Sequence, residues 1–153
     1  FNRRHWETLL RNEFDACRRS HRQATILLID IDHFKTINDT WGHDVGDEAI
    51  VAITRQLQLT LRSGDYIGRF GGDEFAVIMS GTPADSAIAA MSRVHERLVN
   101  MPLHGAPTAR LCISVGVAPW GAQFTHYREW LKAADVALYK AKNAGRGRTE
   151  VAA

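Results

Sequence analysis

Apolar residues recur along the chain with two different spacings. Spacings of three and four positions predict helices over roughly residues 1–20, 45–61, 82–98 and 127–144, with a short segment at 34–39 before the second of these. Strand patterns lie between them: a near-continuous apolar run at 24–31, two short runs at 66–70 and 74–79 around a glycine pair, and an alternating run at 110–117. Residues 149–151 are a candidate edge strand.

The order of these elements predicts an α+β fold. Without the first and last helices it is β-α-β-β-α-β, which is typical of a ferredoxin-like core: a mainly antiparallel sheet with helices on one face. Thr82-Pro83-Ala84-Asp85 predicts a helix start with Thr82 as the hydroxyl N-cap. Gly145 is expected to end the last helix.

Composition adds limits to this picture. The 153 residues suit one domain spanning 1–153, and a net charge of +2, spread along the chain, gives no reason to expect DNA or RNA binding. Cys17 and Cys112 lie in apolar-periodic segments, as expected of core residues in a reducing compartment. Without a membrane-span pattern, we expect a cytoplasmic domain with no membrane contact of its own. Because the chain begins at Phe1 without an initiator Met, we expect a piece of a longer protein.

Acidic residues stand at the ends of the predicted strands. Asp30 and Asp32 are two apart in a strand, so they should share a face, while Ile31 between them faces the core. If the hairpin lies beside this strand, Asp73 at its turn can face Asp30, and such a carboxylate pair suits Mg²⁺. The alternative is that Asp32 caps the following short helix and Asp30 is an ordinary strand-end acid.

Two stretches carry a resemblance to a known family. Gly71-Gly72-Asp73-Glu74-Phe75 and the stretch 29–47 (IDIDHFKTINDTWGHDVGD) resemble the two motifs of the GGDEF family of diguanylate cyclases, and the likeness covers almost the whole chain. It implies a fold similar to nucleotidyl cyclase and polymerase palm domains. It also implies condensation of two GTP into cyclic di-GMP and two pyrophosphates at the interface of a homodimer, with Mg²⁺ or Mn²⁺ as the cofactor.

The resemblance also implies a catalytic centre. Asp30, Asp73 and the carbonyl of Ile31 match the family's metal ligands, and Lys35 matches its phosphate-contacting lysine. Glu74 lies beside the site, and either it or Asp73 could assist removal of the 3′-hydroxyl proton. An acid that simply faces solvent from a hairpin strand is the alternative for Glu74.

Substrate recognition is assigned in the same way. Asn38 and Asp47 match the family's guanine-reading pair, and the family places His43 near the substrate. The alternatives are that Asn38 is a turn residue, that Asp47 is an acid in the first turn of a helix, and that His43 only packs at the turn. Lys142 and Arg146 match two further phosphate contacts and would share a helix face if the helix continues that far. Cations at a helix C-terminus are also common because of the helix dipole alone.

A regulatory site completes the set. Arg62-Ser63-Gly64-Asp65 has the R-x-x-D form of the family's inhibitory site for the product, and Arg93 matches a secondary arginine of that site. A salt bridge at a helix end is the alternative. Arg69 is a candidate extra cation near the hairpin turn.

Three functions stay open at this point: an active diguanylate cyclase, a non-catalytic module of the same family that binds GTP or cyclic di-GMP, and another nucleotidyl cyclase or palm-type fragment. The chain keeps the metal carboxylates and the guanine pair, which favours the first. By resemblance it is the C-terminal catalytic domain of a longer sensor protein. That full-length protein could be anchored to the inner membrane. A monomer should bind GTP without closing the product.

Overall fold

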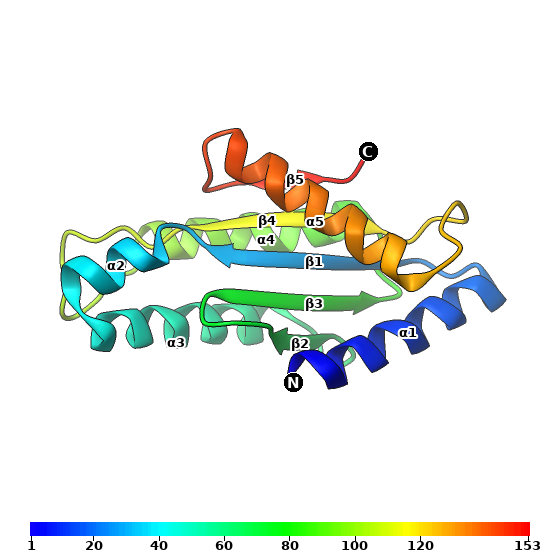
Figure 1. Cartoon of the computed structure of the whole chain (residues 1–153), viewed down its shortest axis with the longest axis horizontal. Helices are drawn as coiled ribbons and strands as arrows, with labels where there is room; N and C mark the ends of the chain where they lie inside the picture. The colour runs from blue at the N-terminus through cyan, green and yellow to red at the C-terminus, as the bar shows by residue number, and fades with distance from the viewer.

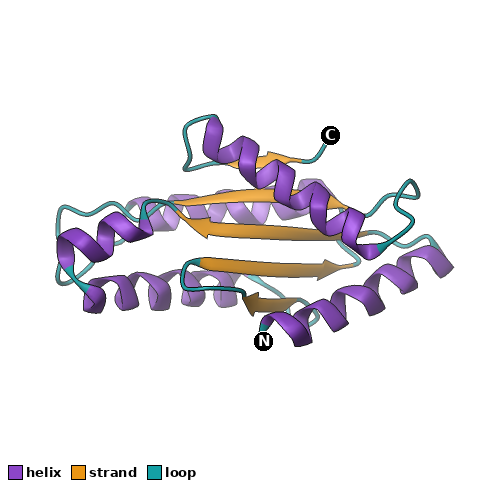
Figure 2. Cartoon of the chain, in the orientation of Figure 1, coloured by secondary structure: helices purple, strands orange, loops and turns teal.

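The computed structural model describes residues 1–153 and contains five helices around a five-stranded sheet (Figures 1 and 2). The helices are α1 (Arg3–Ser20), α2 (Phe34–Trp41), α3 (His43–Thr60), α4 (Ala84–Val99) and α5 (Tyr127–Asn143). The strands are β1 (Ala24–Ile31), β2 (Tyr66–Arg69), β3 (Glu74–Ser80), β4 (Ile113–Pro119) and β5 (Thr149–Val151). None of the helices is long and apolar enough to cross a membrane.

The strands lie in the order β2-β3-β1-β4-β5, and only the β4–β5 pair is parallel. The expected mainly antiparallel α+β fold is therefore confirmed. β1 is the central strand and is buried along its whole length, as its continuous apolar run predicts. Its register places Asp30 opposite Glu74 of β3 on one side and Ser114 of β4 on the other.

Helices cover both faces of the sheet. The expectation of helices on one face applies to the core without the first and last helices, and it is confirmed there, because α3 and α4 pack on the same side while α1 and α5 cover the other. Leu27, Ile29 and Ile31 pack with apolar residues of α3 and α4, whereas Ile26 and Leu28 pack with those of α1 and α5. In Figure 1, α5 lies in front of the sheet and α4 behind it. The reason is that β1 is apolar on both of its faces, and each face must be buried.

Two predicted element ends differ in the structure. The strand expected to start at residue 110 starts at Ile113, because its ladder with β1 ends at the pair Ile31 and Ile113. Beyond that pair, the N–H of Asp32 donates to the carbonyl of Cys112 at 2.9 Å before the chain turns into α2. Thr82 is not the N-cap of α4, since Pro83 takes that place without a side-chain hydrogen bond. The Thr82 hydroxyl instead donates to the carbonyl of Ser80 at 3.1 Å, which ties it to the end of β3.

The end of α5 follows the prediction. Gly145 comes directly after the C-cap and has φ of 118°, a conformation that side chains disfavour. The amides of Gly145 and Arg146 donate to the carbonyls of Lys142 and Ala141, as in a Schellman motif. The chain then turns back to form β5 beside β4.

Candidate active site

The C-terminal end of β1 and the turn between β2 and β3 meet at one end of the sheet. The backbone N–H of Ile31 donates to the carbonyl of Asp73 at 3.0 Å, which holds the glycine turn against the last residue of the strand. Asp30 points to the side of the sheet covered by α5, and the Asp73 carboxyl lies within its reach. The structure thus brings together the three residues predicted as metal ligands.

The electrostatics of this pair favour a cation. Burial, together with the adjacent negatively charged Asp30, raises the pKa of Asp73 to about 6. Asp30 is buried; its Oδ2 forms an ion pair with Lys142 of α5, and its Oδ1 has no hydrogen-bond partner. A buried oxygen without a partner beside a second carboxyl fits a hard divalent ion with oxygen ligands.

The donor set also limits how such an ion would be held. No group of three or more His, Cys, Asp or Glu side chains in the chain could hold a metal alone. An ion at Asp30 and Asp73 would therefore need further oxygen ligands, such as the Ile31 carbonyl, waters or phosphates. Mg²⁺ commonly keeps such a mixed shell.

Asp32 neither caps the following helix nor stands free beside Asp30. It lies on the same side as Asp30, but it is buried and accepts hydrogen bonds from the Ser114 hydroxyl at 2.6 Å and the Gly147 amide at 2.8 Å. It does not cap α2, whose N-cap is His33 with no side-chain hydrogen bond. Asp32 instead ties the end of β1 to β4 and to the loop after α5.

One of the three predicted phosphate cations contacts the carboxylate pair. Lys142 faces Asp30 from the last turn of α5. Arg146 lies beyond the helix, which ends at Asn143, in a left-handed conformation with φ of 63°, so the condition for a shared helix face is not met. Lys35 is exposed in the first turn of α2 and forms no ion pair.

The predicted guanine readers lie on two helices joined by a tight turn. Asn38 is on α2 and Asp47 is near the start of α3, with Gly42 at φ of 92° between the helices. The Oδ1 of Asn38 is buried and has no hydrogen-bond partner, whereas Asp47 is exposed. His43 is exposed at the first position of α3.

The predicted product site forms a cavity of its own. Arg62, Asp65 and Arg93 line a hollow of about 350 Å³ between the end of α3 and α4. Asp65 accepts the backbone N–H of Arg62 at 2.9 Å, and the Arg62 guanidinium bonds to the Thr82 hydroxyl. The side chains of Arg62 and Asp65 form no ion pair, so the alternative of a salt bridge at the helix end is wrong for this pair.

Arg69 braces the hairpin turn. Its guanidinium donates to the carbonyls of Gly71 and Gly72 at 3.1 and 3.0 Å. It was expected to be an extra cation at the turn, but its donors are largely directed at the protein's own backbone. No local pattern in the sequence could show this, since many arginines beside glycines point to solvent.

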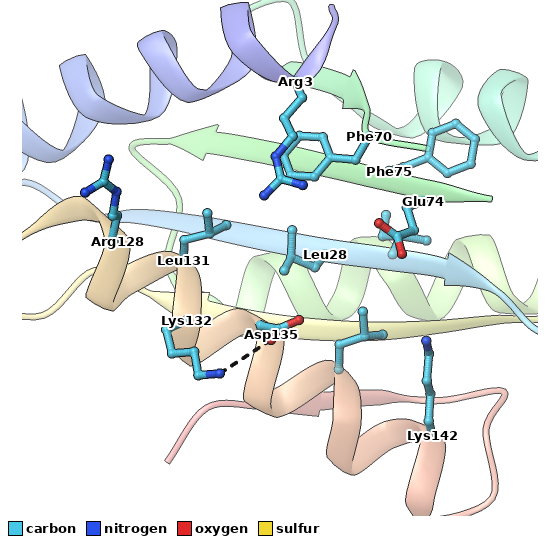
Figure 3. A pocket seen from close by; sticks show the side chains of 12 residues that line it. Arg3, Leu28, Phe70, Glu74, Phe75, Arg128, Leu131, Lys132, Asp135 and Lys142 are labelled. Carbon is cyan, nitrogen blue, oxygen red and sulfur yellow. Dashed lines mark ion pairs between the residues drawn. The ribbon is translucent and has the colours of Figure 1, made fainter. Parts of the chain in front are cut away.

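A cleft of about 340 Å³ extends from this end of the sheet along its surface (Figure 3). It lies over β1 and β3, between α1 and α5, with Glu74 and Lys142 at one end and Arg128 at the other. Arg3 of α1 lies over the Phe70 ring, 4.8 Å from its centroid. The exposed Glu74 is therefore next to open space as well as to Asp30.

Comparison with known proteins gives one family. The family described as "Diguanylate cyclase, GGDEF domain" matches residues 1–148. The probable diguanylate cyclase DgcC of Escherichia coli K12 is 75% identical over 153 residues, which is 100% of this chain and 41% of that protein. Diguanylate cyclase DgcM of the same organism is 40% identical over 124 residues, 81% of this chain and 30% of that protein. The chain thus spans about two fifths of the length of the first of these relatives.

Solved structures show the same fold. The active GGEEF domain of a diguanylate cyclase from Vibrio cholerae superposes with a TM-score of 0.93 at 29% identity, over 99% of this chain and 97% of that one. The GGDEF domain of DgcB from Caulobacter crescentus, in complex with c-di-GMP, also has a TM-score of 0.93, at 26% identity, over 99% and 90% of the two chains.

Proposed function

The chain belongs to the GGDEF family of diguanylate cyclases, and from this premise we propose that it joins two GTP molecules into cyclic di-GMP. Each 3′-hydroxyl attacks the α-phosphorus of the other GTP, so that two phosphodiester bonds form and two pyrophosphates leave. The observation that carries the proposal is the close pair Asp30 and Asp73 with Lys142 beside it. Such a site suits a metal-bound triphosphate.

Asp30, Asp73 and the Ile31 carbonyl would hold Mg²⁺ or Mn²⁺. The bound ion would supply charge neutralisation at the α-phosphate and a lower pKa for the attacking hydroxyl. Asp73 must be ionised for this, and with a pKa of about 6 it is largely ionised at neutral pH. The exposed Glu74, opposite Asp30, is then the carboxylate available to accept the hydroxyl proton.

The remaining cations and the helix pair bind the nucleotide. Lys35, Lys142 and Arg146 offset the charge of the triphosphate. Asp47 accepts from both the N1–H and the exocyclic amine of guanine, two donors that adenine does not offer in that arrangement, and Asn38 completes the pair. His43, at the first position of α3, is one turn before Asp47 and is assigned to the same nucleotide.

Catalysis requires two copies because each domain binds one GTP and neither can close the ring alone. Two sites facing each other bring each 3′-hydroxyl to the other α-phosphate, which replaces an encounter in solution by a fixed geometry. The cavity of Arg62, Asp65 and Arg93 would bind the product and inhibit the enzyme. The full-length protein would carry an N-terminal sensor that controls pairing and an inner-membrane anchor.

The experiment is mass-spectrometric detection of cyclic di-GMP after incubation of the purified chain with GTP and Mg²⁺ at several protein concentrations. We expect product to rise more steeply than linearly with protein, and Asp73→Asn to form none while binding GTP. If no product forms in the wild type even when two copies are joined by an artificial dimerisation domain, the cyclase assignment is wrong and a binding module remains.

A further inference from the structure

Gly46 stands in α3 where a glycine is not required by the backbone. It is buried near the start of the helix, directly before Asp47, and its φ is not positive. A helical glycine is less stable than alanine because it loses more conformational freedom on folding. Some other feature must therefore explain why no side chain is present at this position.

The explanation lies on the neighbouring helix. A Cβ placed on Gly46 would lie 1.8 Å from Oδ1 and 2.9 Å from Cγ of Asn38, and the nearest atoms it would meet all belong to that side chain. Exchanging the amide's oxygen and nitrogen would leave the same clash. The Asn38 side chain thus occupies the space that the missing side chain of Gly46 leaves free.

Asn38 is held there without a hydrogen bond to its oxygen. Its Oδ1 is buried and has no partner, which is unfavourable for an amide that could otherwise turn toward water. Its position is therefore set by packing against α3 and not by a bond. Any atom added at Gly46 would move the amide first, because a flexible side chain gives way more easily than helix backbone.

We propose that Gly46 is a positioning residue for base selection: it leaves the room in which the Asn38 amide lies against α3, at the residue directly before Asp47, at a cost in helix stability. This inference rests on the proposed function, because it assumes that Asn38 and Asp47 read guanine. Gly46 itself touches no substrate. Its effect acts through the place of the Asn38 amide.

The inference predicts effects of opposite sign on binding and on stability. Gly46→Ala should displace the Asn38 amide and lower the affinity for a GTP analogue about tenfold, as expected when a base-reading group is lost. Binding of an ATP analogue should change little, so selectivity for guanine falls. The melting temperature should stay the same or rise, because alanine is the better helix former.

The test is a double-mutant cycle of wild type, Gly46→Ala, Asn38→Ala and the double variant. Calorimetry with non-hydrolysable GTP and ATP analogues in Mg²⁺ measures binding, and thermal unfolding measures stability. Val51→Ala, at an exposed position of the same helix, is the matched control for improved helix propensity. We expect the loss of GTP affinity caused by Gly46→Ala to disappear in the Asn38→Ala background.

Three results would overturn the inference: an equal loss of GTP affinity in both backgrounds, unchanged guanine selectivity in Gly46→Ala, or a melting temperature lowered equally in both backgrounds. Failure of the proposed function looks different, because the wild type would then not prefer the GTP analogue. The thermal-unfolding measurements on the four proteins are made without nucleotide, so they test the packing of Asn38 against Gly46 independently of the proposed function. There, Gly46→Ala should raise the melting temperature more when Asn38 is alanine, since nothing then needs to move.

Discussion

At the scale of single residues, the main feature is a carboxyl that ionises near neutral pH beside a buried carboxylate. Burial is the first cause of the raised pKa of Asp73, and Asp30 adds to it. A proton and a metal ion compete for such a group, since only the carboxylate binds the metal. This competition gives the proposed site a pH dependence that can be measured.

We expect the Mg²⁺ concentration for half-maximal cyclic di-GMP formation to rise as the pH falls below about 6, where Asp73 becomes protonated. Above pH 7 it should be nearly constant, because the carboxylate is already ionised. Titrating Mg²⁺ at pH 5.5, 6.5 and 7.5 checks this. A Mg²⁺ requirement that does not change over that range would contradict Asp73 as a metal ligand.

Arg62 allows a second prediction for a single residue. Its guanidinium lies at the cavity shared with Asp65 and Arg93, so Arg62→Ala should raise the concentration of cyclic di-GMP that halves activity by about tenfold or more, the loss expected for a charged hydrogen-bonding group. Arg55→Ala, a cation on α3 that does not line this cavity, is the control. Equal inhibition of Arg62→Ala and wild type would remove the product-site assignment.

At the scale of elements, the close approach of α5 to β4 positions Lys142. A Cβ on Gly116 would lie 2.3 Å from both the carbonyl oxygen of Ala134 and the amide nitrogen of Leu138. These atoms are helix backbone, so the whole of α5 would have to shift. Gly116 therefore allows the last turn of the helix to reach the end of β1.

Gly116→Ala should lower the free energy of unfolding by roughly 1–3 kcal/mol, the usual cost of overpacking, and also weaken GTP binding because Lys142 moves with the helix. Urea unfolding and calorimetry with a GTP analogue measure the two effects. Gly64→Ala is the control for stability, because a Cβ there meets nothing within 4 Å. A stability close to wild type would show that α5 does not need this close contact.

Local sequence patterns predict some ends of helices and strands correctly and others not. The bounds of β1 and the hairpin around Gly71-Gly72 follow from apolar runs and glycines, and both predictions are confirmed. Thr82 was predicted from an equally good capping pattern, yet its hydroxyl bonds to Ser80 and Arg62 instead. A helix N–H and the Arg62 guanidinium compete as donors to the same hydroxyl oxygen, and Arg62 lies outside the local capping pattern.

At the scale of the whole molecule, His95 links α4 to the C-terminal strand. Its ring bonds the Thr149 hydroxyl at 2.9 Å, and burial lowers its pKa, an effect that the negative Asp32 partly offsets. The folded state therefore disfavours the charged imidazole more than the unfolded state does. The stability from this group is fully present above the unfolded pKa of about 6.5 and is lost as the pH falls below it.

We expect His95→Gln, which keeps a hydrogen-bonding group but does not titrate, to lose less stability than the wild type between pH 7.5 and 5.5. Asp73 acts in the opposite sense, because its raised pKa makes the folded state more favourable as it becomes protonated. The difference between variant and wild type is thus the quantity to measure, by urea unfolding at both pH values. Equal pH dependence in the two proteins would contradict a half-buried imidazole that the fold keeps neutral.

The sequence by itself determined the element types, the central place of the apolar strand 24–31 and the family motifs, because these depend on periodicities and residue types within a few positions of each other. Only the tertiary structure decided where polar groups find their partners. It directs Asp32 to Ser114 and Gly147, and it sets the Asn38 amide against Gly46. The Asp32 contacts join segments far apart along the chain, and the Asn38 contact joins two helices across the turn at Gly42. Both depend on how helices and strands pack and not on the periodicity of either segment.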